Sequence, residues 1–348
     1  MRRIPFLFRC DGSPEIGMGH VRRCVALALA LRDLGGEPVF VMRPIADTPL
    51  RVVEQAGFAV ERVAGALDTA FTVDRAMAVG ARCVVVDHYG ATPADFRQLR
   101  AAGFQVAVID DLADRDLGAA NWVLNQNPDA VDMSYRVSPE CRVLRGPAYA
   151  LLRPEFSRIR QSQTRKFSAN DRQVLVTFGG GATADTCAEV LVALNQAPRS
   201  FVVQCVLGGE GAATAGLDRA VADSKHEIRI IRNAENMADL MAAADVSVNA
   251  AGSTCWELCC LGVPMAILAL APNQAPNASA LVRHGCACLA GFASQSGAIP
   301  ETIAPLVTDL LTDPRRRSGM SARGRELVDG LGAHRAAQTL MDLSVTEE

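Results

Sequence analysis

The sequence predicts an α/β protein made of two successive Rossmann-like domains, each with a parallel sheet. Short apolar runs alternate with amphipathic helical segments through most of the 348 residues, as expected for open parallel sheets. A polar, charged stretch near residues 158–172 interrupts this alternation once, and the alternation then restarts. We therefore expect a first domain over 1–157, a linker over 158–172 whose first part is helical, and a second domain over 173–348.

Composition narrows the class of protein. A formal net charge of −3 gives no basic field for nucleic acid or an anionic membrane. The eleven cysteines form no C-x-x-C pattern, and many lie in apolar runs, which favours reduced core thiols over disulfides or a zinc site. We find no signal peptide and no apolar run long enough to span a bilayer. These features predict a cytoplasmic protein with neither nucleic acid nor membrane as partner, and they do not indicate an oligomeric state.

The chain opens on a strand, a polar loop and a helix. Residues 6–8 are an apolar strand, and an amphipathic helix begins near Gly19. Gly17 and Gly19 let the backbone approach a ligand closely, and the helix N-terminus favours a negative charge there. Because such loops lie at the carboxyl edge of a sheet, we expect the active site here. Its polar candidates are Arg9, Asp11, Ser13 and His20.

The pattern of this loop is open to a second interpretation. Many α/β proteins contain a strand–loop–helix turn with two glycines, and a lone histidine such as His20 often caps a helix or fills a pocket. The stretch matches neither a dinucleotide fingerprint nor a P-loop, so an oxidoreductase is disfavoured.

The rest of the first half continues the alternation. We expect helices at 50–56, 71–79 and 94–101, and strands at 38–42, 58–63, 83–90, 105–111 and 122–127. The strand that starts at Cys83 is the clearest buried one, and its end delivers Asp87, His88 and Tyr89 to the same sheet edge. Alternatively, Asp87 caps the next helix and Tyr89 is a buried ring. Which of His88 and Tyr89 faces the site is left open.

Metal binding is not expected. Asp110 and Asp111 resemble a metal pair, but no third ligand has suitable spacing.

The second half offers two devices for a phosphate. We expect strands within 173–181, 201–209, 228–233, 246–253, 264–270 and 286–291, and helices at 184–195 and 236–244. The first device is the triplet of Gly179, Gly180 and Gly181, where bare backbone can approach a phosphate. The second is the helix that Ser253 and Thr254 are predicted to cap, with Glu257 one turn in, suited to ribose hydroxyls. An ordinary capping box explains the same residues equally well.

Two motifs resemble a known family. The pattern R-x-D-x-S-x-x-I-G-x-G-H-V-x-R, from Arg9 to Arg23, resembles the opening signature of the UDP-sugar hydrolases of pseudaminic (nonulosonic) acid biosynthesis. The pattern A-G-S-T-x-W-E-L-x-x-x-G-V-P, residues 251–264, resembles the donor-binding segment of GT-B proteins, including the MurG-type glycosyltransferases. The likeness covers roughly residues 4–290. It implies a GT-B fold with a cleft between the domains, in which the last helix often returns to the first domain.

The resemblance also implies roles. Glu257 would bind ribose, Ser253 and Thr254 the diphosphate, and the backbone of Asn236 and Met237 the uracil. An Asn-Gln pair, here Asn273 and Gln274, would face the sugar.

The activity that the resemblance implies is hydrolysis of UDP-2,4-diacetamido-2,4,6-trideoxy-β-L-altropyranose with inversion, without a cofactor. We predict that His20 is the general base or positions the water. Asp11 and Asp87 are candidates to orient His20 or the water, and Tyr89 to contact the sugar or the water. Arg9 or Arg23 could instead pair with Asp11. The alternatives are a glycosyltransferase of the same fold and a non-catalytic nucleotide-sugar-binding protein.

Overall fold

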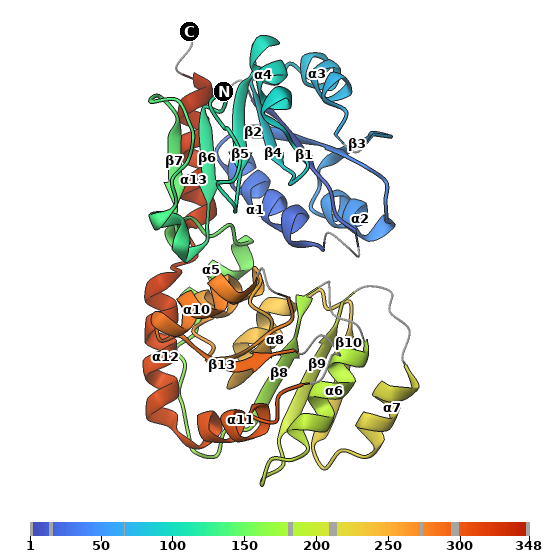
Figure 1. The fold of residues 1–348 in the computed structure, drawn as a ribbon, viewed down its shortest axis with the longest axis vertical. Helices are drawn as coiled ribbons and strands as arrows, with labels where there is room; N and C mark the ends of the chain where they lie inside the picture. Colours follow the sequence, from blue (N-terminus) through green and yellow to red (C-terminus); the bar gives the residue numbers. More distant parts are fainter. Residues whose placement is uncertain are drawn as a thin grey trace. The chain divides into compact units, whose positions relative to one another are not determined.

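The chain forms two compact units in the computed structural model (Figure 1). The first unit comprises Met1–Pro154 and Gly330–Glu348, and the second comprises Glu155–Asp329. The structure describes residues 3–13, 17–65, 67–179, 184–208, 214–271, 274–293 and 299–345. The segment predicted as a linker, 158–172, lies in the second unit and begins with the end of helix α5 (Pro154–Ser162).

The first unit is built on a seven-stranded sheet whose paired strands are all parallel. Its strand order is β3-β2-β1-β4-β5-β6-β7, which contains the Rossmann order and reverses direction at β1 and β4. The strands are β1 (Ile4–Cys10), β2 (Gly36–Met42), β3 (Ala59–Arg62), β4 (Cys83–Asp87), β5 (Gln105–Ile109), β6 (Trp122–Asn125) and β7 (Arg142–Arg145). The helices are α1 (Gly19–Asp33), α2 (Asp47–Gln55), α3 (Thr69–Ala78), α4 (Pro93–Ala101) and α13 (Gly332–Val345), with short 3₁₀ turns at Pro128–Asp132 and Pro147–Tyr149.

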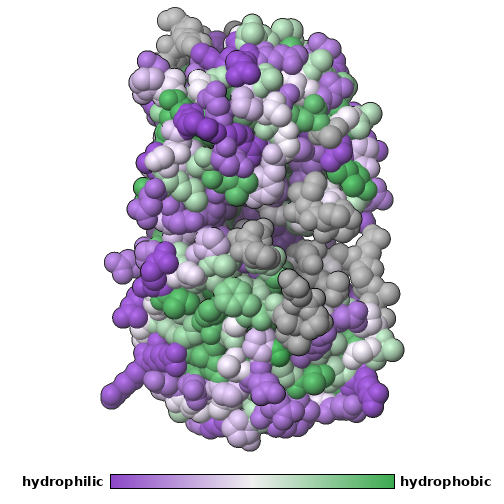
Figure 2. All heavy atoms as spheres, viewed as in Figure 1, coloured by the Kyte–Doolittle hydropathy of each residue, from purple (hydrophilic) through white to green (hydrophobic). Residues whose placement is uncertain are grey.

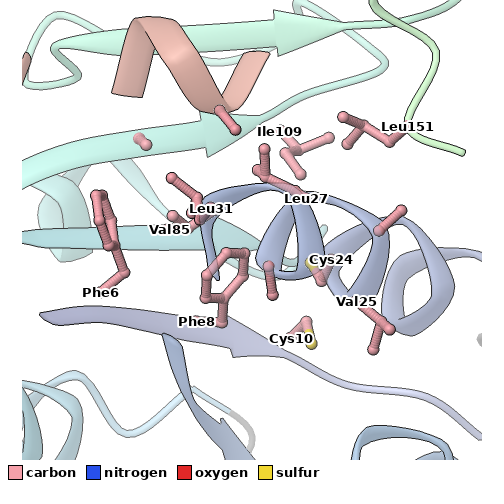
Figure 3. Close-up of a cluster of buried hydrophobic side chains, with 14 of the residues drawn as sticks. Phe6, Phe8, Cys10, Cys24, Val25, Leu27, Leu31, Val85, Ile109 and Leu151 are labelled. Atoms are coloured by element: carbon pink, nitrogen blue, oxygen red, sulfur yellow. The ribbon is translucent and has the colours of Figure 1, made fainter. Parts of the chain in front are cut away.

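One face of this sheet packs against α1. Phe6 and Phe8 of β1 are fully buried against Leu27 and Leu31, which lie one helical turn apart on α1 (Figure 3). Helix α13 belongs to the same core through residues such as Leu340. The end of the chain therefore completes a core that its first residues begin.

The second unit repeats the design with six strands. Its order, β10-β9-β8-β11-β12-β13, again reverses at the first strand of the unit. The strands are β8 (Gln173–Thr177), β9 (Val202–Leu207), β10 (Glu227–Arg232), β11 (Val246–Asn249), β12 (Met265–Ala269) and β13 (Ala287–Phe292). Besides α5, the helices are α6 (Ala184–Leu194), α7 (Ala215–Ala222), α8 (Met237–Ala243), α9 (Thr254–Leu261), α10 (Ala275–Arg283), α11 (Ile303–Thr312) and α12 (Pro314–Leu327). The prediction of two parallel-sheet α/β domains is confirmed.

The cysteines behave as the sequence predicts. All eleven are free, and nine of them are buried. Burial raises the pKa of the Cys83 thiol to about 12, so this side chain stays protonated and serves as a small apolar residue.

The exposed large hydrophobic side chains of the described residues are spread along the chain, from Ile45 to Leu331. On the face drawn in Figure 2, hydrophobic residues gather over part of the second unit, with hydrophilic residues around them. Among the described residues, no helix has the length and apolar character that a membrane span requires.

Candidate active site

The carboxyl ends of neighbouring parallel strands bring polar side chains to one edge of the first sheet. This edge is where open α/β sheets bind ligands, above all where the strand order reverses. Register pairing sets Cys10, the last residue of β1, beside Asp87, the last residue of β4. The polar residues at this edge are Asp11 after β1, Arg43 after β2, Asp87 at the end of β4, Tyr89 after β4, Asp111 after β5 and Asn127 after β6.

His20 and Asp87 form a buried hydrogen-bonded pair. His20 lies in the first turn of α1, and its Nδ1 is 2.6 Å from Asp87 Oδ1. Burial opposes ionisation of Asp87, but the charge of Arg23 and the hydrogen bonds from Arg23 and His20 outweigh it and hold the pKa of this carboxyl well below its usual range. An ionised carboxylate only accepts hydrogen bonds, so we assign the ring proton to Nδ1. The hydrogen-bonding contacts of the His20 ring with the described residues are at Nδ1, which leaves the Nε2 lone pair without a partner among those residues.

Arg23 fixes this pair from the next turn of the same helix. Its Nε donates to Asp87 Oδ2 and its Nη2 to Asp87 Oδ1, both at 2.6 Å. Its Nη1 donates to both oxygens of Asp111, at 3.0 and 2.8 Å. Burial disfavours the guanidinium charge, but the two carboxylates outweigh it and raise the pKa of Arg23. One guanidinium and two carboxylates give the cluster a net charge of −1 beside the His20 ring.

Tyr89 joins the same cluster. Its hydroxyl donates to Asp111 Oδ2 at 2.9 Å, and its ring meets the His20 ring edge-on, with centroids 4.6 Å apart. Burial of the hydroxyl and the charge of Asp111 raise the pKa of Tyr89, so it stays protonated. The side chain as a whole is 52% exposed, so the interpretation of Tyr89 as a buried ring is wrong.

Asp87 is not a helix cap. Helix α4 is capped by Thr92, which forms a capping box with Asp95, and Pro93 is the first helical residue. Asp87 is instead committed to His20 and Arg23.

Asp11 forms a second network at the same edge. Arg9 binds both of its oxygens, at 2.7 and 3.0 Å, and Arg43 donates its backbone N–H at 2.8 Å and its Nε at 2.9 Å. His88 Nε2 lies 3.3 Å from Asp11 Oδ2, while Gly90 donates its N–H to His88 Nδ1. Burial opposes ionisation of Asp11, but hydrogen bonds from His88 and Arg9 outweigh it and lower its pKa below the usual range.

These contacts show which of the predicted residues pair with one another. Asp87 orients His20, whereas Asp11 is engaged by Arg9, Arg43 and His88. Arg9 does pair with Asp11, as one alternative held, and Arg23 pairs with Asp87 and Asp111 instead. Sequence reasoning missed Arg43 and Asn127. The available signal was that Arg43 directly follows one predicted strand, 38–42, and that Asn127 is the last residue of another, 122–127.

The loop before α1 is tied at its base. Gly17 donates its N–H to the Ser13 carbonyl at 2.7 Å and has a φ of 82°, a conformation that favours glycine. Gly19 is the first residue of α1, and the N-cap residue Met18 offers no oxygen to the free N–H groups of the first turn. This end of the helix carries partial positive charge suited to an anion.

In the second unit, the two predicted phosphate-binding elements, the glycine loop after β8 and the start of α9 after β11, lie where the strand order reverses. Gly179 follows β8 with a φ of 73°, and a Cβ built there would lie 3.9 Å from Thr254 Oγ1, so these two residues are neighbours. Helix α9 begins at Thr254, and Glu257 lies in its first turn. Ser253 is the N-cap residue but makes no side-chain capping bond, so the predicted cap and the capping-box interpretation are both wrong. Gly180 and Gly181 lie outside the described residues.

The remaining predicted residues begin helices. Asn236 is the N-cap residue of α8, and Met237, its first residue, is buried. Gln274 is the N-cap residue of α10, and its Oε1 accepts the backbone N–H of Leu270 at 3.0 Å. Asn273 lies outside the described residues.

Asp110 and Asp111 are not arranged as a metal pair. Asp111 accepts hydrogen bonds from Arg23, Tyr89 and Asn127, and Asp110 Oδ1 accepts two backbone N–H groups. Within the ranges that the structure describes, no three His, Cys, Asp or Glu side chains are grouped as metal ligands would be.

Comparison with solved structures settles the fold. The chain is similar to MurG of Acinetobacter baumannii, with a TM-score of 0.69 and 17% identity over 98% of this chain and 99% of that one. The chain has the GT-B fold. Among other GT-B-like structures, a UDP-GlcNAc 2-epimerase from Neisseria meningitidis has a TM-score of 0.63 and 14% identity, covering 97% of this chain and 100% of that one.

Sequence comparisons also relate this chain to proteins of the glycosyltransferase type. Residues 174–333 match the glycosyltransferase family 28 C-terminal domain. The chain is 22% identical to the UDP-2,4-diacetamido-2,4,6-trideoxy-β-L-altropyranose hydrolase of Campylobacter jejuni, over 80% of this chain and 96% of that protein. It is 29% identical to the spore coat polysaccharide biosynthesis protein SpsG of Bacillus subtilis, over 60% of each. It is 25% identical to an uncharacterized protein of Methanocaldococcus jannaschii, over 74% of this chain. The match spans 54% of the length of the M. jannaschii protein and 60% of the length of SpsG.

Proposed function

We propose that this GT-B protein is an enzyme that hydrolyses a UDP-sugar, and that its substrate is UDP-2,4-diacetamido-2,4,6-trideoxy-β-L-altropyranose. The observation that carries the proposal is the His20–Asp87 pair, in which Nδ1 is committed to the carboxylate and Nε2 is left to take a proton. The opening motif and the C. jejuni relative of that name support the choice of substrate.

In the proposed reaction, His20 Nε2 takes a proton from water as the water oxygen bonds to the anomeric carbon. The bond between that carbon and the phosphate oxygen breaks, UDP leaves with the electron pair, and the sugar inverts its configuration. Asp87 stabilises the imidazolium that forms, as the carboxylate does in other histidine bases. The net negative cluster of Asp87, Arg23 and Asp111 favours the positive charge that develops on the sugar ring. Tyr89, a protonated hydroxyl beside His20, contacts the water or the sugar.

The second unit is proposed to bind the nucleotide. The N-terminus of α9, with Ser253 and Thr254, and the adjacent Gly179 would hold the diphosphate. Glu257 in the first turn would accept hydrogen bonds from the ribose. The backbone at Asn236 and Met237 would meet the uracil, and Asn273 with Gln274 the sugar.

The first unit is proposed to complete substrate binding at its loop. The N–H groups that open α1, with Gly17, Gly19 and Ser13, suit an oxygen of the diphosphate. Arg9 would act through Asp11, which it holds in place.

A glycosyltransferase is the second candidate. The match of residues 174–333 to a glycosyltransferase domain favours it, because an acceptor hydroxyl could replace water at the same base.

The test is anomeric-resolved NMR of the purified protein with the proposed substrate and no acceptor. We expect UDP and free sugar of inverted configuration, and a loss of about 10²–10⁴-fold in rate for His20→Asn. The matched control is His284→Asn, because His284 is an exposed residue at the C-terminus of α10. Wild-type protein that binds UDP but leaves the sugar attached would contradict hydrolysis and favour transfer.

A further inference from the structure

In the network around Asp11, two arginine side chains bind one carboxylate. Arg9 and Arg43 contribute +2 and Asp11 contributes −1, so these three side chains together carry a net charge of +1. The neighbouring cluster around Arg23 has a net charge of −1. One sheet edge thus carries a negative group beside the proposed base and a positive group on the strands next to it.

Arg43 is the member of the positive group that reaches solvent. The Arg9 and Asp11 side chains are each 1% exposed, whereas the Arg43 side chain is 26% exposed. Arg43 uses its Nε and its backbone N–H on Asp11. Its Nη1 and Nη2 have no hydrogen-bond partner among the described residues, so up to four N–H donors remain.

Asp11 does not need the Arg43 side chain for its own charge. Arg9 already binds both carboxylate oxygens, and the Arg43 backbone N–H adds a third hydrogen bond. The Nε contact therefore does more for Arg43 than for Asp11, because it fixes the plane of the guanidinium and the direction of its two terminal nitrogens.

The two networks are joined through the end of β4. His88 faces Asp11, and its chain neighbour Asp87 binds His20. Strand β1, which ends one residue before Asp11, pairs directly with β4 at Asp87. Arg43 therefore lies within the same sheet edge as the proposed base, within reach of one bound molecule.

We propose that Arg43 is a substrate-binding residue whose Nη1 and Nη2 donate to an oxygen of the sugar nucleotide. This inference rests on the proposed function. The planar, positively charged fork of Arg43 suits an oxygen that carries negative charge or a strong carbonyl dipole. The substrate offers two such sources, the diphosphate and the carbonyl of an acetamido group, and the test distinguishes them.

The test compares wild type with Arg43→Gln by calorimetric titration with UDP, UDP-glucose and UDP-GlcNAc, and by KM and kcat on the proposed substrate. We expect the substitution to raise Kd or KM at least about tenfold, the effect of losing a charge-assisted hydrogen bond. Equal weakening for all three ligands identifies the diphosphate, and weakening for UDP-GlcNAc alone identifies the acetamido carbonyl. Binding and KM within twofold of wild type would overturn the inference.

The matched control is Arg62→Gln. Arg62 ends β3, pairs in register with Met42 and is 63% exposed, with Glu54 3.9 Å away. The Arg62→Gln substitution also removes one positive charge, from the strand next to β2, and we expect it to leave binding unchanged. An equal loss in both variants would also overturn the inference.

A conservative variant guards against misfolding. Arg43→Lys keeps the charge but lacks the fork, so with unchanged thermal unfolding it is expected to weaken binding severalfold, and unchanged binding would refute the role. If wild type neither binds nor cleaves any UDP-sugar, the proposed function itself fails and this inference falls with it.

Discussion

Arg23 binds one buried carboxylate, Asp87, and one partly buried carboxylate, Asp111, with a single side chain. It lies three residues after His20 on α1, so both project from the same face of the helix. Burial of each charge is unfavourable alone, and the cluster is stable only because every carboxylate oxygen receives a donor. A cluster of this kind tolerates the loss of one partner poorly.

Asp87→Asn tests this dependence. We expect a loss of about 3–5 kcal/mol in the free energy of unfolding, because Arg23 would keep a buried charge facing an amide. Turnover should fall by about 10²–10⁴-fold, since the Nδ1 proton of His20 loses its carboxylate. Denaturant unfolding and steady-state kinetics measure the two effects. Asp74→Asn, at an exposed position on α3, should change neither.

The depressed pKa values of Asp87 and Asp11 predict the direction of acid sensitivity. Both carboxyls have folded pKa values below their ordinary value of 3.8, so they stabilise the fold fully at higher pH. As the pH falls below about 4, the unfolded chain takes up protons first and this stability is lost, by up to about 1.4 kcal/mol per pH unit for each group. Unfolding measured from pH 6 to pH 3 should show a shallower decline for Asp87→Asn than for wild type. Parallel curves would contradict the assignment.

Among the elements, α13 depends on a glycine for its place in the first unit. A Cβ at Gly332 would lie 2.4 Å from the Ala150 carbonyl oxygen and 2.5 Å from the Ala150 nitrogen. Backbone atoms cannot give way as a flexible side chain can. Trp122 Nε1 donates to Thr339 Oγ1 at 2.9 Å, so a shift at the start of α13 would also disturb β6.

Gly332→Ala is therefore expected to lower the free energy of unfolding by about 1–3 kcal/mol, the usual cost of overpacking. Gly319→Ala on α12 is the control, because no atom lies within 4 Å of its Cβ position. Alanine there should be neutral or stabilise by up to about 1 kcal/mol through helix propensity. Equal effects of the two substitutions would show that the close approach at Ala150 does not matter.

Helices and strands whose apolar residues follow a clear pattern could be predicted from the sequence, and those without such a pattern could not. Strand β4 is an unbroken apolar run, and α1 carries an apolar face, so both were predicted. Strand β7 has only four residues, two of them arginine, and α12 is dominated by arginine and glycine. Their assignment depends on tertiary packing, which outweighs local pattern.

The site divides in the same way. His20, Asp87 and Tyr89 could be nominated because they follow strands or open a helix. Which carboxylate serves His20 is decided by the pairing of β1 with β4, 77 residues apart between the paired Cys10 and Asp87. No local sequence pattern encodes that choice. The hydrogen bonds from Arg43 to Asp11 likewise depend on the pairing of separate strands.

At the scale of the whole molecule, the chain leaves the first unit at Pro154 and returns to it at Gly330. The cluster that holds Phe6 and Phe8 also holds Ala336 and Leu340, whereas a separate cluster in the second unit holds Leu311. The two cores share no residue in these clusters. The first unit therefore requires both ends of the chain before its core is complete.

Leu340→Ala and Leu311→Ala test this organisation as a reciprocal pair. Both leucines are on helices and almost fully buried, so each substitution should cost about 2–5 kcal/mol locally. Hydrogen exchange of the full chain should show faster exchange in β1, β4 and α1 for Leu340→Ala, with the second unit little changed. Leu311→Ala should accelerate exchange in β8, β11 and α6 instead, because local opening follows the core that is damaged. Uniform acceleration of exchange across both units in either variant would mean that the two units unfold as one cooperative body. The stability of each core would then depend on the other.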